Sequence, residues 1–195
     1  AKLFACPNFM RYINTIIPGK FSEAALKHDE ARLLIPFIDD KGNVHALQGR
    51  SLNKNSDIKY ITVVLNEEIP KIYGLDTLDR DKTTYVVEGP IDSMFIKNCV
   101  ATAGGDLVST VKSLDKSKVV IVYDNEPRSK ETKKKLDKAV MNGYSICIWP
   151  ENVEHKDIND MVSAGLSSEF IEHIIKTNTY RDLSAKLALQ KWSKA

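Results

Sequence analysis

Short apolar runs separated by polar turns make up the first part of the chain. Two such runs, at residues 32–38 and 44–50, flank the segment 39–43 (Asp-Asp-Lys-Gly-Asn), and this arrangement is typical of a β-hairpin. A third extended run, at residues 59–65, follows a polar loop. The residues before the hairpin predict only a short helical or irregular lead-in. The pattern therefore predicts a small lobe that contains β-strands.

From residue 83 onward, runs of strand length alternate with segments of helical periodicity. The expected strands lie at residues 85–87, 100–103, 118–123 and 144–149. The expected helices lie at residues 90–98, 107–114 and 130–142, and begin again near residues 157, 167 and 180. The run at 118–123 is continuously apolar, as a central parallel strand should be. Alternating strands and helices predict a parallel sheet with helices on both faces.

This change in the pattern of predicted strands and helices divides the chain into three expected parts. A small α+β lobe would span residues 1–82, an α/β domain residues 83–165, and a helical tail residues 166–195. The expected fold class is therefore α/β. Because the sequence starts with Ala rather than Met, we expect it to be part of a longer protein.

The composition is that of an ordinary globular protein and excludes few functions. The net charge is +2, from 28 Lys and Arg and 26 Asp and Glu residues, so charge alone says nothing about nucleic-acid binding. Cys6, Cys99 and Cys147 form no Cys-x-x-Cys pair, which argues against a zinc site or a disulfide framework and fits a reducing cytoplasm. No apolar run is long enough to span a bilayer and no secretion signal opens the sequence, so we expect no membrane contact.

Acidic residues directly follow the expected strands of the second part. Glu88 ends the first strand with Asp92 one helical turn later, Asp124 and Glu126 follow the central strand, and Asp157 comes after the next one. Ligands of open α/β sheets bind at the carboxyl ends of the strands, so these carboxylates are expected to converge on one pocket. Oxygen donors without His or Cys suit Mg²⁺ or Mn²⁺. Taken singly, each acid is equally a loop or helix-cap residue, and for Asp157 both interpretations stay open.

These segments resemble the motifs of the Toprim domain shared by DnaG-type primases and topoisomerases. Residues 88–92 (Glu-Gly-Pro-Ile-Asp) resemble its Glu-Gly-x-x-Asp motif, and residues 124–126 (Asp-Asn-Glu) stand at its Asp-x-Asp motif. Residues 156–160 resemble the Lys-Asp-Pro-Asp segment of primases. Four upstream segments resemble, in the same order, the signatures of the primase basic lobe: 32–36, 49–52, 59–60 and 72–75. The chain is therefore identified as similar to the DnaG-type primases, with the most similar motifs in the branch that occurs in T-even phages.

The resemblance implies a Toprim fold, which is a Rossmann-like parallel sheet with flanking helices, preceded by a small basic α+β lobe. It implies synthesis of short RNA primers from ribonucleoside triphosphates on single-stranded DNA, in the cytoplasm of an infected bacterium and beside a replicative helicase. Glu88, Asp124 and Glu126 would act in catalysis, and together with Asp92 and Asp157 they would hold Mg²⁺ or Mn²⁺. Glu126 stands where the family has Asp, which leaves the exact coordination open.

The resemblance also assigns contacts with template or nucleotide to basic residues. These are Arg32, Arg50, Lys59, Lys71, Arg128 and Lys156. Physically, Arg can grip a phosphate through two hydrogen bonds and Lys supplies a mobile charge. Arg128 could instead pair with Glu126, and the lysine-rich segment 130–135 is expected to be a solvated helix face.

Two other functions are compatible with the same residues. A Toprim nuclease would use the carboxylates to hydrolyse DNA, although the upstream basic motifs argue against it. A non-catalytic module would dock a helicase and bind DNA without chemistry, although the acidic residues that it would not need are present.

Overall fold

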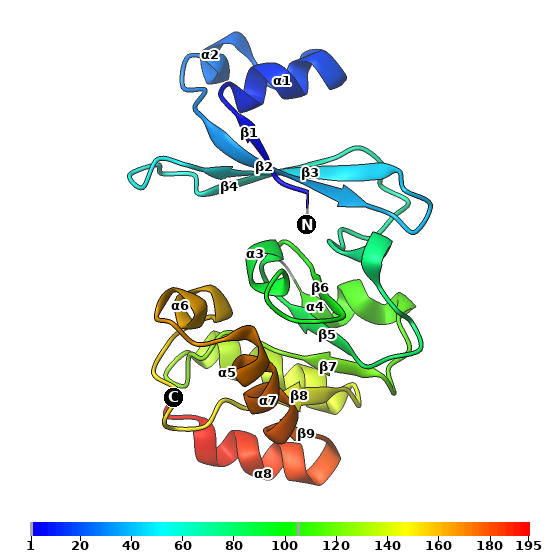
Figure 1. Cartoon of the computed structure of the whole chain (residues 1–195), viewed down its shortest axis with the longest axis vertical. Helices are drawn as coiled ribbons and strands as arrows, with labels where there is room; N and C mark the ends of the chain where they lie inside the picture. Colours follow the sequence, from blue (N-terminus) through cyan, green and yellow to red (C-terminus); the bar gives the residue numbers. More distant parts are fainter. Residues whose placement is uncertain (1, 105) are drawn as a thin grey trace. The chain divides into compact units, whose positions relative to one another are not determined.

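The computed structural model describes residues 2–104 and 106–195, which belong to two compact units, Ala1–Lys71 and Ile72–Ala195 (Figure 1). The first unit is built on a four-stranded antiparallel sheet with the strand order β1-β2-β3-β4. Its strands are β1 (Phe4–Cys6), β2 (Arg32–Ile38), β3 (Val44–Ser51) and β4 (Tyr60–Val64). The predicted hairpin and third strand are confirmed, whereas β1 was not predicted because three residues carry no periodic signal.

Two helices, α1 (Phe9–Ile16) and α2 (Glu23–Leu26), lie on one face of this sheet (Figure 1). The apolar side of α1 buries Phe9 and Ile13 against Leu34, Leu47 and other side chains of the sheet. Burying each such side chain contributes about 1.5–3 kcal/mol. The helix therefore depends mainly on this packing, since eight residues form a marginal helix by themselves.

The second unit contains a five-stranded sheet with the order β6-β5-β7-β8-β9. The strands are β5 (Thr84–Val87), β6 (Cys99–Ala101), β7 (Val119–Ile121), β8 (Ser145–Cys147) and β9 (Thr179–Tyr180). The first four pair in parallel, as the sequence predicts. The edge strand β9, which was not predicted, pairs with β8 in the antiparallel direction. A strand of two residues leaves no pattern from which it could be predicted.

Helices cover both faces of this sheet, as expected. They are η1 (Leu75–Thr77), α3 (Pro90–Ser93), α4 (Leu107–Thr110), η2 (Val111–Ser113), α5 (Lys130–Met141), α6 (Ile158–Ser163), α7 (Ser168–Thr177) and α8 (Asp182–Trp192). Val86 of β5 joins a core with residues of α4, α5 and α8, and the next residue, Val87, joins a second core with residues of α6 and α7. The helix expected at 90–98 is only one turn long; tighter turns, in which each N–H bonds the carbonyl three residues before it, continue it to Ile96, and Asn98 then has φ of 50° before β6.

The boundary between the two units lies before the expected boundary at residue 82. Ile72 is buried in the core of the second unit, and Tyr73 pairs with Ala101 beside β6. The expected helical tail packs as α7 and α8 on the two faces of the sheet. Within the described ranges, no helix combines the length and the apolar character that crossing a bilayer requires.

Candidate active site

Carboxylates gather at the carboxyl ends of the parallel strands β5 and β7. Glu88 directly follows β5, and Asp124 follows the extended segment after β7. These strands are neighbours in parallel register, so their carboxyl ends meet at the same edge of the sheet. Asp92, Asp124 and Asp157 line one small hollow there, together with apolar side chains from both strands.

Asp124 is the most strongly perturbed carboxyl group of this cluster. Burial, and then the negative charges of Glu88, Asp92 and Asp157, together raise the pKa of Asp124 from 3.8 to about 7. Lys156, at 3.9 Å from Asp124 Oδ2, acts in the opposite direction. The fold therefore brings four of the five predicted metal ligands close enough to repel one another.

Asp92 is held in place by Gly89 and by α6. Its Oδ1 accepts a hydrogen bond of 2.9 Å from the backbone N–H of Asn159, in the first turn of α6. A Cβ atom on residue 89 would lie only 2.6 Å from Asp92 Oδ2. Glycine at this position thus leaves room for the Asp92 carboxylate, whereas its φ of −110° is one that other residues also adopt. Asp157 is the N-cap of α6, with Oδ1 accepting from the N–H of Asp160 at 2.7 Å, so its helix-cap role is present whatever else it does.

Two lysines bind the acidic residues directly. Lys135 of α5 places its Nζ 3.1 Å from Glu88 Oε1 and 3.0 Å from Glu131 Oε1. Lys156 places its Nζ 2.9 Å from Glu126 Oε1, and this hydrogen bond is the main cause that lowers the pKa of Glu126. The expectation that the whole segment 130–135 is a solvated face is wrong for Lys135. The sequence holds no signal for this contact, because helical spacing does not reveal which lysine of a run meets a strand end.

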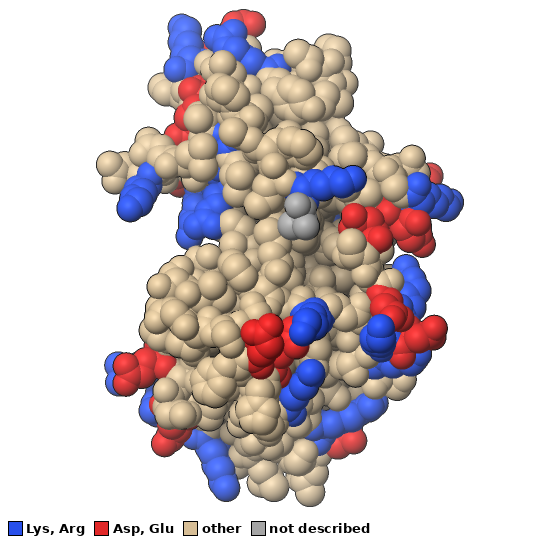
Figure 2. Space-filling view, viewed as in Figure 1, with Lys and Arg blue, Asp and Glu red and all other residues tan. Residues whose placement is uncertain are grey.

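Glu126 shares Lys156 with Asp124 and has a further partner of its own. Besides Lys156, it accepts a hydrogen bond of 2.9 Å from Thr132 Oγ1 in the first turn of α5. Its ion-pair partner is thus Lys156, and Arg128 lines a neighbouring cavity of about 550 Å³ together with Trp192 and Lys194. In Figure 2, acidic and basic side chains lie side by side on the second unit.

The donor chemistry of the cluster fits a divalent cation that is shared with a substrate. Among the described residues, no three His, Cys, Asp or Glu side chains are close enough to hold a metal ion by themselves. Magnesium, however, is commonly bound by one or two carboxylates plus phosphate oxygens of the substrate. The repulsion that raises the pKa of Asp124 is the interaction that such a cation would relieve.

The predicted basic residues of the first unit have different environments. Arg32, for which a contact with template or nucleotide is predicted, is only 1% exposed and donates its hydrogen bonds within the unit. Arg50 and Lys59 both lie next to the Tyr60 ring. The Arg50 guanidinium carbon is 5.8 Å and the Lys59 Nζ 5.6 Å from the centre of that ring. Lys59 and Tyr60 are exposed, and so is Lys71.

Comparison with known proteins finds similarity to DNA primases. No protein-family model matches the sequence. The DNA primase of Enterobacteria phage T4 is 38% identical over 186 residues, which are 94% of this chain and 53% of the relative, so the chain spans about half the length of that relative.

Solved structures have the same fold at lower identity. The RNA polymerase domain of Mycobacterium tuberculosis primase DnaG superimposes with a TM-score of 0.64 at 17% identity, covering 97% of this chain and 72% of that chain. The DnaG primase catalytic domain bound to single-stranded DNA superimposes with a TM-score of 0.55 at 18% identity, covering 75% of this chain and 51% of that chain. The chain is therefore homologous to the DNA primase of phage T4, and it has the fold of the DnaG RNA polymerase domain.

Proposed function

We propose that this chain is the catalytic part of a primase, which joins ribonucleotides into short RNA primers on a single-stranded DNA template. The observation that carries the proposal is the group of carboxylates at the carboxyl ends of β5 and β7, where burial and mutual repulsion raise the pKa of Asp124 to about 7. Carboxylates crowded in this way suit divalent cations, which are the usual agents of phosphoryl transfer. In the reaction, a 3′-hydroxyl would attack the α-phosphate of a ribonucleoside triphosphate and pyrophosphate would leave.

The cation, Mg²⁺ or Mn²⁺, would be held by Glu88 and Asp124, with Asp92, Glu126 and Asp157 around them. When bound, it supplies the positive charge that activates the attacking oxygen and stabilises the charge on the α-phosphate. The chain itself orients the carboxylates: Lys135 binds one oxygen of Glu88 and leaves the other available. Because Glu88, Asp92 and Asp157 repel the Asp124 carboxylate, a cation bound at this point would reduce that repulsion.

The template would run over the first unit beside Arg50 and Lys59. Their charges could bind phosphates, and the exposed ring of Tyr60 beside them could stack on a base. The similar DnaG catalytic domain bound to single-stranded DNA supports a template of this kind. Lys71 would extend the same contacts, whereas Arg128 and Lys156 would meet the triphosphate near the carboxylates.

Primer synthesis from labelled ribonucleotides, single-stranded DNA and Mg²⁺ tests the proposal. Glu88→Gln is expected to lower the yield at least about a hundredfold, the usual scale for losing a metal-positioning or acid–base group. Glu131→Gln is the matched control, because Glu131 also binds Lys135 but is 78% exposed on α5, and its loss is expected to leave the yield unchanged.

The same assay separates the alternative functions. Shortened template without labelled RNA would identify a nuclease instead. No product in the presence of metal and a replicative helicase, the partner that the resemblance implies, would contradict the catalytic proposal. The cytoplasm of an infected bacterium is the compartment that this function requires.

A further inference from the structure

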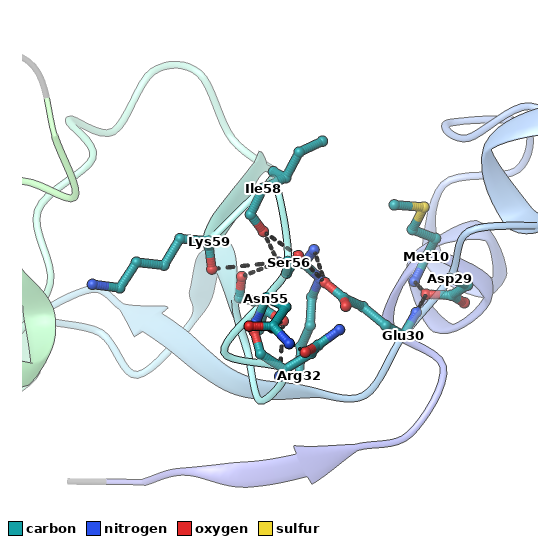
Figure 3. Close-up of polar contacts among 11 residues, drawn as sticks. Met10, Asp29, Glu30, Arg32, Asn55, Ser56, Ile58 and Lys59 are labelled. Atoms are coloured by element: carbon teal, nitrogen blue, oxygen red, sulfur yellow. Dashed lines mark hydrogen bonds and ion pairs between the residues drawn. The ribbon is translucent and has the colours of Figure 1, made fainter.

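Arg32, at the start of β2, donates its hydrogen bonds to the backbone of the segment that leads into β4. Its side chain is 1% exposed, and Nη1 donates to the carbonyl oxygens of Gly49 at 3.2 Å, Ile58 at 2.9 Å and Lys59 at 3.4 Å. Nη2 donates to Glu30 Oε1 at 2.6 Å. One guanidinium therefore holds two adjacent strands and the residue just before a third (Figure 3). Such a fork of donors is a property of Arg that Lys does not share.

Glu30 connects the same guanidinium to the loop between β3 and β4. Its Oε1 also accepts a hydrogen bond of 2.6 Å from the hydroxyl of Ser56, and this bond is the main cause that lowers the pKa of Glu30. The neighbouring Asp29 accepts hydrogen bonds from the N–H groups of Met10 and Arg11 at 2.8 and 2.9 Å, which ties this segment to α1. The loop is thus hydrogen-bonded to a segment that is itself hydrogen-bonded to α1.

The sequence leaves room for the Arg32 side chain at Gly49. A Cβ atom there would lie 2.9 Å from Arg32 Cδ and 2.7 Å from two ring carbons of Phe9. Glycine in β3 therefore leaves room for both the Arg32 stem and the Phe9 ring. The arrangement is built into the core of the unit and is not a chance surface contact.

The carbonyl that Arg32 holds belongs to a residue whose side chain faces solvent. The Lys59 carbonyl oxygen also accepts from the N–H of Ser51 at 2.9 Å, so the peptide plane is fixed from two sides. Figure 3 shows the Lys59 side chain extending away from the polar network while its carbonyl oxygen faces the network. The Lys59 Nζ then lies 5.6 Å from the centre of the exposed Tyr60 ring.

We propose that Arg32 is a positioning residue for template binding, which sets the backbone of Ile58 and Lys59 so that the Lys59 side chain meets the DNA. This inference rests on the proposed template role of Lys59. Arg32 contributes to affinity through Lys59 and makes no contact with DNA itself. Its charge is neutralised inside the unit by Glu30.

A double-mutant cycle on single-stranded DNA affinity tests this role, using Arg32→Gln, Lys59→Ala and the double variant. Arg32→Gln is expected to weaken binding about tenfold in the parent chain but less than about twofold when Lys59 is already Ala, because a residue that acts through another has no effect once that other is gone. Arg32→Lys is expected to bind DNA as weakly as Arg32→Gln, since it keeps the charge but loses the planar set of guanidinium donors. Equal factors in both backgrounds, or full affinity in Arg32→Lys, would overturn the positioning role.

Backbone amide exchange gives a readout that needs no DNA. Arg32→Gln is expected to speed exchange at Ser51 and Ser56 while the amides of Thr62 and Val63 keep their protection. Lys41→Gln, which removes an exposed charge from the other hairpin turn, is the matched control and is expected to change neither group.

Two further results distinguish the possible failures. If Arg32→Gln unfolds the unit, Ser56→Ala replaces it in the test, because it removes only the hydroxyl that joins the loop to Glu30. Ser56→Ala is expected to weaken DNA binding by a smaller factor than Arg32→Gln, and again only when Lys59 is present. Unchanged exchange at Ser51 and Ser56 would refute the positioning role alone. Unchanged affinity in Lys59→Ala would refute the template role of Lys59, and the positioning role with it.

Discussion

Asp124→Asn is expected to make the folded chain more stable at pH 8 when divalent metal is removed with EDTA. Asp124 is largely buried, and its carboxylate is repelled by Glu88, Asp92 and Asp157. Asparagine has nearly the same size and carries no charge, so the substitution removes the repulsion without opening a cavity. The contact that it also removes is the ion pair with Lys156 at 3.9 Å, which is long and partly exposed.

The magnitude follows from the pKa. A folded-state pKa of about 7, against 3.8 for the ordinary group, is a difference of about 3 units. One unit corresponds to about 1.4 kcal/mol, so ionising Asp124 costs the folded state at most about 4 kcal/mol. Because the side chain is 27% exposed and the lost ion pair offsets part of the gain, we expect an increase of about 1–3 kcal/mol in the free energy of unfolding.

The pH dependence has a definite sign. Below pH 4 the carboxyl group is protonated in both the folded and the unfolded chain, so the substitution should have little effect there. Between about pH 4 and pH 7 the unfolded chain loses this proton while the folded chain keeps it, and the original protein therefore loses stability as the pH rises. The advantage of Asp124→Asn should open through this window and be complete at pH 8.

Urea denaturation at pH 4 and pH 8, both in EDTA, measures this difference. Asp137→Asn is the control, because it removes the same charge from an exposed position of α5 and should change stability little. An Asp124→Asn variant no more stable than the original protein at pH 8 would refute the reasoning. The same would follow from a gain of equal size at both pH values.

Three further substitutions test other contacts of the structure. Gly89→Ala places a Cβ atom 2.6 Å from Asp92 Oδ2, so it should lower the free energy of unfolding by about 1–3 kcal/mol in urea denaturation, and much less when Asp92 is also replaced by Ala. Lys135→Met should change the affinity for Mn²⁺, measured by calorimetry, about tenfold or more, whereas Lys134→Met, one residue away and exposed, should change it little. Lys59→Ala should lower the salt slope of single-stranded DNA binding by about 0.7, and an unchanged slope would show that Lys59 contacts no phosphate.

The sequence by itself determined the elements whose residues form a local pattern. The Asp/Gly/Asn turn between two apolar runs predicted β2 and β3, and continuous apolar runs predicted β5 and β7, because burial of one or both faces dictates the residue period. The position of Glu88 and Asp124 after such strands was enough to predict their convergence, since parallel strands end at the same edge. The order of motifs was enough to recognise the family.

Only the tertiary structure decided which partner each charged side chain meets. Lys135 and Glu88 are 47 residues apart, and the sheet order and the docking of α5 bring them together, whereas Lys134 on the same helix remains exposed. Arg32 occupies a basic motif position, yet it lies inside the first unit because Gly49 leaves room for it and Glu30 neutralises it. A residue period records which face of an element is buried, but a contact between distant charges depends on how whole elements pack, and no local pattern encodes that.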